Sequence, residues 1–376
     1  MSNLRDNFID GLKKELGHLP YSEVEKIVSF FEESIEDKLD DGISEEDIFS
    51  VFGSYEDVAK EILEDYDSSK RKTDFDFDIQ KKEKTLKEYT FDETFENILL
   101  NDINSHIIVK PSTDDKIHLK VYENKNKFYE VTTNSSLEII CIEKPEFFFK
   151  NITFNFKNDY DLTELYIPMN SSNTNLKVKN KNGDIKLSDL VLKNLESNLK
   201  NGNLHTSTLK LKSANLDLMN GNIVINNFYS KKTNIKNMNG KIEICENTSG
   251  DFSVSNINGS IILNCSTSEN LSIKNINGTI NLDDVLSKSF IHLENVNGKI
   301  TFNDIRYITY MDIKCTHGNV KGNLPFKEDE ISFDLVSTFG NIKLNDSKTG
   351  NLKTKAVGDL SFKCFNSFGN IKVTTL

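Results

Sequence analysis

The sequence of 376 residues contains no tryptophan, five prolines and only five cysteines. The number of cysteines is odd and no Cys-x-x-Cys spacing occurs, whereas disulfide frameworks and common zinc sites need paired or closely spaced cysteines. The cysteines are Cys141, Cys245, Cys265, Cys315 and Cys364. We therefore expect isolated thiols in a reducing compartment. The sequence predicts no metal site and no cofactor.

Long apolar runs are also missing. No stretch approaches the ~18 uninterrupted apolar residues of a membrane-spanning helix. The first residues, MSNLRDNFIDGLKKELG, alternate charged with apolar side chains and lack the apolar core of a secretory signal. We therefore predict a cytoplasmic protein without an integral membrane span. The alternative is a cell-surface location reached by leaderless export.

Positive charge is scarce, and it is unevenly placed. Residues 1–69 hold 20 acidic against 6 basic residues, a balance of −14, whereas the rest of the chain holds 38 against 40. The formal net charge is −12, and the run KRK at 70–72 is the one locally basic stretch. Nucleic-acid binding requires an extensive basic surface. The composition therefore predicts no nucleic-acid partner.

Residues 1–67 have helical periodicity with helix start and stop signals. Leu4, Phe8, Leu12 and Leu16 recur on one helical face and are followed by Gly17. Three further amphipathic segments follow, with Ser-x-x-Glu or Ser-x-x-Asp starts at Ser22, Ser44 and Ser54 that are typical of helix caps. We predict an all-α module of four short helices over residues 1–67, followed by a linker over residues 68–90.

The stretch LGHLPYSEVEKIVSFFEESIEDKLDDGISEEDIFSVFGSYEDVAKEIL, residues 16–63, resembles the HAAS (DUF1700) domain. The resemblance is carried by a Leu-Pro start, an acidic helix, a Gly-x-Ser-Glu-Glu turn and a Gly-Ser-x-x-x-x-Ala segment. It implies a helical signalling domain, frequently encoded beside PadR-like transcriptional regulators. Members of this family often continue into membrane spans, and this chain does not.

The second predicted helix carries an acidic run. Its members are Glu32, Glu33, Glu36, Asp37, Asp40 and Asp41. One interpretation is a solvated helix face that keeps a small domain soluble. The other is a docking surface for a basic protein partner, and for the module as a whole interaction is the preferred interpretation.

A strict repeat governs the second half of the chain. Glycines at 183, 202, 221, 240, 259, 278, 298, 318 and 340 are spaced by 19 residues, rising to 20 and 22 at the end. A weaker unit surrounds Gly358, and Gly369 follows. Such a period indicates stacked identical units. Nineteen residues are too few for a propeller blade, and the Leu spacing of leucine-rich repeats is missing.

Aligned on glycine, the units have apolar residues two and four positions later and five positions earlier, as in strands with one inward face. We predict a mostly β protein whose parallel β-solenoid of ~19-residue coils spans residues 91–376. Residues 91–170 are expected to form irregular capping coils and residues 171–376 regular repeats. Ile257 and Ile261 are assigned to the core. Because the chain ends after a repeat strand, we expect either end-to-end self-association or protection by a degenerate coil.

The order of strands, Leu-x-Ile-Pro and Asn-Gly-x-Ile repeats resembles the DUF4097 family, described as candidate adhesins with β-helical folds. The resemblance covers residues ~90–376. Its combination with a HAAS-like head is typical of low-GC Gram-positive bacteria. A related layout occurs in enterococcal surface proteins that sense envelope stress and antimicrobial peptides.

Asparagine precedes the repeat glycine by one and by three positions. The pairs at the centre of the array are Asn239 with Gly240, Asn258 with Gly259, Asn277 with Gly278, and Asn297 with Gly298. Asn tolerates left-handed backbone and Gly adopts it freely, and stacked Asn side chains bond from coil to coil. We therefore predict a structural ladder and turn. A flat amide array that binds carbohydrate is the alternative.

Acidic residues recur six positions after the glycine, and Asp284 and Asp304 lie one coil apart. Their ~5 Å separation is near that of the two carboxyls of a retaining glycosidase. However, the same position holds Thr208, Asn227 and Cys265 in other coils, as expected of a turn. The six histidines form no i,i+4 pair, and phosphate-binding and nucleophile motifs are missing. No catalytic residue is predicted.

The preferred hypothesis is a non-enzymatic interaction or scaffold protein in bacterial envelope-stress or PadR-linked signalling. The helical head would dock a protein partner, a regulator or an envelope component, and the solenoid would present a rigid binding face. The first alternative is a surface-exposed adhesin or antimicrobial-peptide sensor. The second is a carbohydrate-active β-helix enzyme that uses Asp284 and Asp304.

Overall fold

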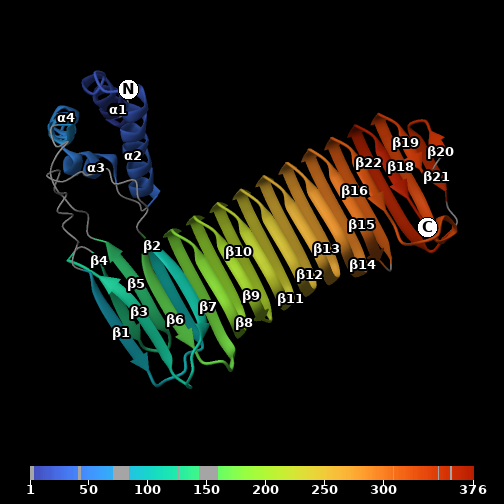
Figure 1. The fold of residues 1–376 in the computed structure, drawn as a ribbon, viewed down its shortest axis with the longest axis horizontal. Helices are drawn as coiled ribbons and strands as arrows, with labels where there is room; N and C mark the ends of the chain where they lie inside the picture. Colours follow the sequence, from blue (N-terminus) through green and yellow to red (C-terminus); the bar gives the residue numbers. More distant parts are fainter. Residues whose placement is uncertain are drawn as a thin grey trace. The chain divides into compact units, whose positions relative to one another are not determined.

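The computed structural model describes residues 4–40, 44–70, 84–125, 127–143, 160–307, 309–345, 347–355 and 358–376. The chain divides into two compact units, which we describe separately. Within the described ranges, the first contains four helices and the second contains the strands (Figure 1). Among the described residues, no helix is long and apolar enough to cross a membrane.

The helical unit consists of α1 (Leu4–Glu15), α2 (Tyr21–Asp40), α3 (Glu45–Phe52) and α4 (Tyr55–Lys70). Helices α3 and α4 begin as the sequence predicts, because the Ser44 and Ser54 hydroxyls each accept the backbone N–H three residues later at 3.2 Å. Gly53, with a φ of 78°, ends α3. Helix α2 begins at Tyr21, directly after Pro20, so Ser22 is the second residue of the helix rather than the residue before it.

One apolar core holds these helices together. It includes Leu12, Leu16 and Ile35, all fully buried, and a group of phenylalanine rings around Phe8. Leu4, which shares the helical face of Phe8, is instead exposed at the start of α1. Helix α4 extends to Lys70, three residues into the segment expected to be a linker.

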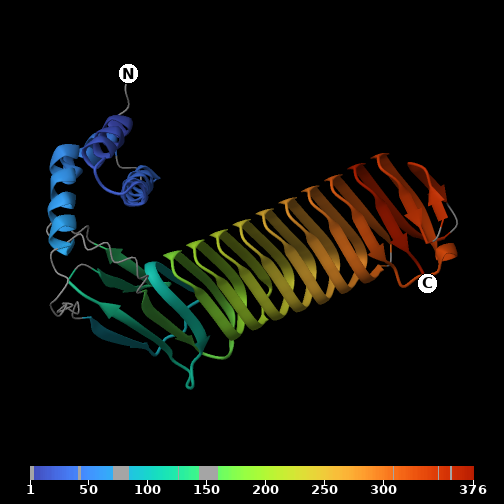
Figure 2. The ribbon, with the colours of Figure 1, turned by 45° about the horizontal axis from the view of Figure 1, so that its top comes forward.

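The described residues of the β unit form 23 strands, most of which stack into a parallel solenoid (Figures 1 and 2). The strands that precede the regular coils are β1 (Thr85–Phe91), β2 (Asn97–Pro111), β3 (Ile117–Glu123), β4 (Lys127–Thr133), β5 (Leu137–Glu143), β6 (Asp161–Ile167) and β7 (Ser171–Asn182). The regular coils contain β8 (Ile185–Asn201), β9 (Leu204–Lys210), β10 (Ser213–Asn220), β11 (Ile223–Asn239), β12 (Ile242–Asn258), β13 (Ile261–Asn277), β14 (Ile280–Asn297), β15 (Ile300–Tyr307), β16 (Tyr310–His317) and β17 (Val320–Asn323).

Each coil passes through two sheets, and a bulge at its corner sets which residues face inward. In β12, Ile242 and Ile244 are buried before the corner. Glu246 then takes a left-handed conformation, with a φ of 53°. After it the inward positions change from even to odd, so that Asn247 and Ser249 are buried, and beyond Gly250 they return to even positions, as at Phe252. A residue in this conformation adds one position to the alternation, as a β-bulge does. The same corner occurs at Asp284 and Asp304, which confirms that this column forms a turn.

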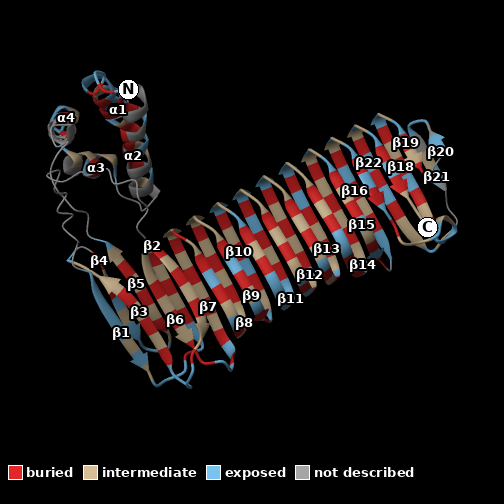
Figure 3. Ribbon diagram, viewed as in Figure 1, coloured by how far each residue is buried: buried red, intermediate tan, exposed pale blue. Residues whose placement is uncertain are grey.

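The core follows the predicted columns, and it is visible as continuous buried stripes in Figure 3. Ile242, Ile261 and Ile280 are each fully buried, and each such side chain contributes about 1.5–3 kcal/mol. The assignment of Ile257 to the core is wrong: it is 37% exposed. Ile257 lies between the buried Asn256 and the outward Asn258, so the alternation of the strand turns it out of the core.

The segment before the regular coils combines β2, which pairs parallel like a coil of the solenoid, with antiparallel strands. The first half of β2 lies between β5 and β7, and its second half lies between β6 and β8. Strand β4 pairs antiparallel with β5, and β3 lies antiparallel between β6 and β1. Strands β1, β3 and β4 therefore run antiparallel to their neighbours at this end of the solenoid, and a short loop joins the hairpin of β4 and β5. Strand β1 begins inside the segment expected to be a linker.

At the other end the spatial order of coils departs from the sequence order. The last strands are β18 (Ile331–Phe339), β19 (Ile342–Leu344), β20 (Ser347–Thr349), β21 (Leu352–Lys355), β22 (Leu360–Phe368) and β23 (Ile371–Thr374). Strand β22 lies between β16 and β18, and β23 lies between β17 and β19 (Figure 1). The final repeat of the sequence is thus inserted one coil inward, and the segment around Gly358 does not form a coil of its own.

Two short antiparallel strands cover the outer coil. Strand β20 pairs with β19, and β21 pairs with β18. They are three and four residues long and carry Lys348, Lys353 and Lys355. Short, lysine-bearing edges resist pairing with another chain. We expected this end either to self-associate or to be protected, and the structure shows a protected end. The strand with the sequence IKVT, β23, lies inside the sheet and not at its edge.

The inserted coil can be tested by engineered disulfides. Tyr310 is in register with Ser361, and Ser361 is in register with Ser332. Neighbouring strands are about 4.8 Å apart, within the Cα separation that a disulfide needs, whereas two steps are about 10 Å. In a background with Cys245 and Cys265 changed to Ser, we expect the Tyr310→Cys/Ser361→Cys pair to close under mild oxidation. The Tyr310→Cys/Ser332→Cys pair, which the sequence order favours, should stay reduced in the same thiol titration.

Candidate functional site

At the turn that carries the repeat glycine, the main chains of successive coils lie in close contact. Gly259 has a φ of 130°, and a Cβ there would overlap the carbonyl oxygen of Gly240 in the preceding coil. The Gly259 N–H donates to Asn277 of the next coil at 2.8 Å. Gly240, Gly278 and Gly298 have the same geometry. Only glycine combines this φ with such contact between successive coils.

Each turn has an inner and an outer asparagine. The inner residue, Asn256, is buried, and its Nδ2 donates to the Gly240 carbonyl at 3.0 Å. The outer residue, Asn258, faces out of the core, and its Nδ2 donates to Asn239 Oδ1 at 2.8 Å. The inner column therefore ties side chain to backbone between coils, whereas the outer column bonds side chain to side chain.

The outer column, which we call the outer ladder, continues through eight asparagines at 2.7–2.9 Å. Its members are Asn104, Asn182, Asn201, Asn220, Asn239, Asn258, Asn277 and Asn297. Beyond Asn297 the column becomes a stack of rings, His317 on Phe368 and Phe368 on Phe339, with centroids 4.8 and 4.9 Å apart. Asn104 belongs to β2, which precedes the periodic region, so the repeat spacing does not predict its place in the outer ladder.

In the first coil, a charged residue takes the place of the inner asparagine. Asp102 is in register with Asn180 and is 2% exposed. The hydroxyls of Tyr129 and Thr163 each donate to its carboxylate at 2.7 Å, and Lys127 Nζ lies 3.6 Å away. Burial lowers the pKa of Lys127, but the neighbouring carboxylates outweigh it and raise this pKa overall. Burial also raises the pKa of the Tyr129 hydroxyl. This paired cluster joins the two sheets.

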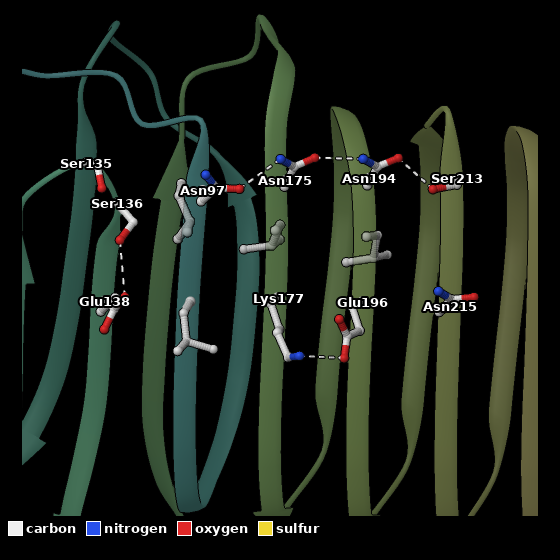
Figure 4. A pocket seen from close by; sticks show the side chains of 14 residues that line it. Asn97, Ser135, Ser136, Glu138, Asn175, Lys177, Asn194, Glu196, Ser213 and Asn215 are labelled. Atoms are coloured by element: carbon white, nitrogen blue, oxygen red, sulfur yellow. Dashed lines mark hydrogen bonds and ion pairs between the residues drawn. The ribbon is translucent and has the colours of Figure 1, made fainter.

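A groove of ≈ 660 Å³ lies on the outer face of the unit, over β5, β2, β7, β8 and β10 (Figure 4). One side is a row of hydrogen-bonded polar side chains that we call the rim row, formed by Asn97, Asn175, Asn194 and Ser213. Ser136 and Glu138 line the groove on β5, beside Asn97 and Leu99 at the end of the row. The sequence repeat does not reveal this groove, because Asn97, Ser136 and Glu138 precede the periodic region.

A second row runs across the floor of the groove. Leu99 is half-buried, between Glu138 on one neighbouring strand and Lys177 on the other. Lys177 Nζ lies 2.7 Å from Glu196 Oε1, and this hydrogen bond lowers the pKa of Glu196. The floor therefore offers an aliphatic patch beside one carboxylate and one closed ion pair.

The predicted partner-binding residues lie on the second helix of the helical unit. Glu36 is exposed on α2, and Glu32 is half-buried. Glu33, Asp37 and Asp40 are carried by the same helix, but their side chains, like Asp41, lie outside the described residues. The helix thus presents at least one carboxylate to solvent.

Asp284 and Asp304 lie at an exposed corner of the solenoid. The Arg306 Nη2 donates to Asp284 Oδ1 at 2.7 Å and to Asp304 Oδ2 at 3.1 Å. Both carboxylates are about half exposed, at 50% and 43%, and neither lines the groove. The corner is stabilised by a guanidinium that bridges two coils. In the described part of the chain, no three His, Cys, Asp or Glu side chains gather closely enough to hold a metal ion.

The two units are thus a helical module and a β-solenoid. The Toastrack DUF4097 family model matches residues 95–374, and the HAAS family model matches residues 7–61. The match to the first spans most of the chain, so the chain belongs to the Toastrack DUF4097 family. No curated protein matches the chain.

Three solved structures are similar to the β unit at low identity. A candidate cell adhesion protein from Clostridium sporogenes is 13% identical over 78% of this chain and 100% of its own, with a TM-score of 0.22. A candidate adhesin from Bacteroides fragilis is 13% identical over 77% and 97%, with a TM-score of 0.36. A candidate lipid binding protein from Parabacteroides distasonis is 11% identical over 76% and 96%, with a TM-score of 0.38.

Glycine at the turn should be irreplaceable. We expect Gly259→Ala to lower the free energy of unfolding by about 2–4 kcal/mol, because the new methyl group combines left-handed strain with overlap of the Gly240 carbonyl. Gly350→Ala is the matched control, since nothing lies within 4 Å of its Cβ position. Urea unfolding followed by circular dichroism measures both. Equal midpoints for the two variants would contradict this role of the turn.

The outer ladder should contribute less than the glycine. Asn258→Ala removes the donor to Asn239 and the acceptor for Asn277, and we expect a loss of about 1–2 kcal/mol. Asn215→Ala, an exposed asparagine outside both asparagine columns of the turn, should change stability by less than about 0.5 kcal/mol. The same urea titration tests the pair. If Asn258→Ala left the free energy of unfolding unchanged, the hydrogen bonds of the outer ladder would stabilise the fold no more than hydrogen bonds to water.

Proposed function

We propose that this chain is a non-enzymatic interaction protein. The helical module docks a protein partner, and the solenoid presents a rigid binding face that runs along its axis. The observation that carries the proposal is the preformed groove of ≈ 660 Å³ on a scaffold whose turns are tied from coil to coil. Such a scaffold positions side chains for binding without the need for a moving part.

The acidic balance of the first 69 residues supports a basic surface on the protein partner. The HAAS match supports a place in signalling beside a transcriptional regulator or an envelope component. The corner at Asp284 and Asp304 supports structure rather than catalysis, because one guanidinium already binds both carboxylates. A surface adhesin or peptide sensor is the second candidate, favoured by the open groove. Cell fractionation with protease treatment of intact cells distinguishes the cytoplasmic version from the surface version.

The docking role of α2 predicts a salt-sensitive complex. In the full chain, we expect Glu32→Gln with Glu36→Gln to reduce capture of the partner roughly threefold to tenfold, because exposed ion pairs each contribute about 0.2–1 kcal/mol. Glu93→Gln with Glu96→Gln, two exposed glutamates of the β unit, is the matched control and should capture normally. Quantitative pull-down at two ionic strengths measures the effect. Undiminished capture by the α2 variant would overturn the assignment.

A further inference from the structure

The hydrogen bonds in the rim row all donate toward Asn97, so the side-chain nitrogen of Asn97 donates to no other member of the row. Ser213 donates to Asn194, Asn194 donates to Asn175, and Asn175 Nδ2 donates to Asn97 Oδ1, at 2.6–2.8 Å. The Asn97 oxygen is therefore engaged within the row. Figure 4 shows its Nδ2 on the side away from Asn175. The row fixes this amide while directing its N–H groups into the groove.

The floor beneath this amide combines an apolar patch with hydrogen-bonding groups on both sides. Leu99 separates the Glu138 carboxylate from the Lys177 ammonium in the register of the sheet. The Ser136 hydroxyl donates to Glu138 at 3.2 Å and orients that carboxylate. Leu99 therefore has the Asn97 amide two residues away on its own strand and the Glu138 carboxylate beside it on the next strand. This arrangement fits a ring that has C–H groups on one face and hydroxyls at its edge. Hydroxyls both donate and accept, so they satisfy both sides of the groove.

The main chain of the floor is not available to a ligand. Strand β2 pairs with β5 on one side and with β7 on the other, and β7 pairs in turn with β8. The backbone N–H and C=O groups of these strands are used within the sheet. A peptide that adds a strand to a free edge therefore finds no edge here. Recognition in this groove depends on side chains.

The charge of the groove excludes acidic ligands. Among the described residues that line the groove, Lys177 is the one basic side chain and is paired with Glu196 at 2.7 Å, whereas Glu138 adds a further negative charge. An anionic ligand would meet net repulsion from these side chains. A neutral ligand rich in hydroxyls meets only hydrogen-bonding partners.

We propose that the groove binds a short neutral oligosaccharide, laid across β5, β2, β7, β8 and β10 along the solenoid axis. Asn97 and Glu138 hydrogen-bond its hydroxyls, and Leu99 contacts one sugar face. The five strands span about 19 Å at the usual strand spacing, which accommodates more than one sugar ring. This inference rests on the proposed binding function, for which it names a ligand class.

The full chain is titrated calorimetrically with neutral chito-, cello-, malto- and manno-oligosaccharides, and with oligogalacturonate as the acidic counterpart. We expect at least one neutral series to bind, with an affinity unchanged by raised ionic strength, and oligogalacturonate not to bind. Asn97→Ala and Glu138→Ala should each weaken binding about tenfold, the loss of one good hydrogen bond. Asn270→Ala is the matched control: Asn270 occupies the same repeat position and bonds Asp251 at 2.7 Å, outside the groove.

Three results would overturn the assignment: no neutral series binds at millimolar concentration, the acidic ligand is preferred, or the groove variants bind like Asn270→Ala. Thermal unfolding of each variant verifies that the groove residues, which are exposed or half-buried, have not disturbed the fold. The same preparations are assayed for partner capture through α2 and for released sugar. Partner capture without sugar binding would reject the groove assignment alone. Sugar release would reject the non-enzymatic function while leaving the groove in place.

Discussion

The close approach of successive glycine turns is the constraint on which the β unit depends. Each glycine places its Cα against the carbonyl of the glycine one coil before, so that no side chain fits between them. This contact sets the coils at the spacing of hydrogen-bonded strands. The inner asparagine then satisfies the same carbonyl, and the outer asparagine continues the bond on the surface. The two asparagines and the glycine of the Asn-x-Asn-Gly motif thus act together to join one coil to the next.

A second constraint acts at the opposite corner of each coil. There a non-glycine residue adopts a left-handed conformation and shifts the inward alternation by one position. Its side chain varies between Asp, Thr, Asn, Glu and Cys because it faces solvent, and only its backbone is constrained. The bridge from Arg306 to Asp284 and Asp304 is a local reinforcement of this corner.

The ends of the stack are where a solenoid is most exposed to unwanted pairing. At one end, β1 and β4 close the two sheets in antiparallel fashion around the buried Lys127 and Asp102 pair. At the other, the final repeat is inserted one coil inward, and short lysine-bearing strands cover the outer coil. The groove lies beside the first of these ends, where the change from cap to regular coils brings Glu138 of β5 next to β2 and β7. The site therefore arises from the departure from the repeat.

The sequence by itself determined the features that repeat. Period, glycine spacing and the apolar columns around Ile242, Ile261 and Ile280 predicted a solenoid and its turns, because a local pattern that recurs in every coil needs no knowledge of distant contacts. The Ser44 and Ser54 caps were equally local. Ile257 was misassigned because the buried position beside it belongs to a polar residue, Asn256, and the alternation of the strand then turns Ile257 outward. The inserted coil, the pairing of Asp102 with Lys127 and the groove around Asn97 and Glu138 were decided by tertiary structure. Each joins residues far apart in the chain, and only strand register brings them together.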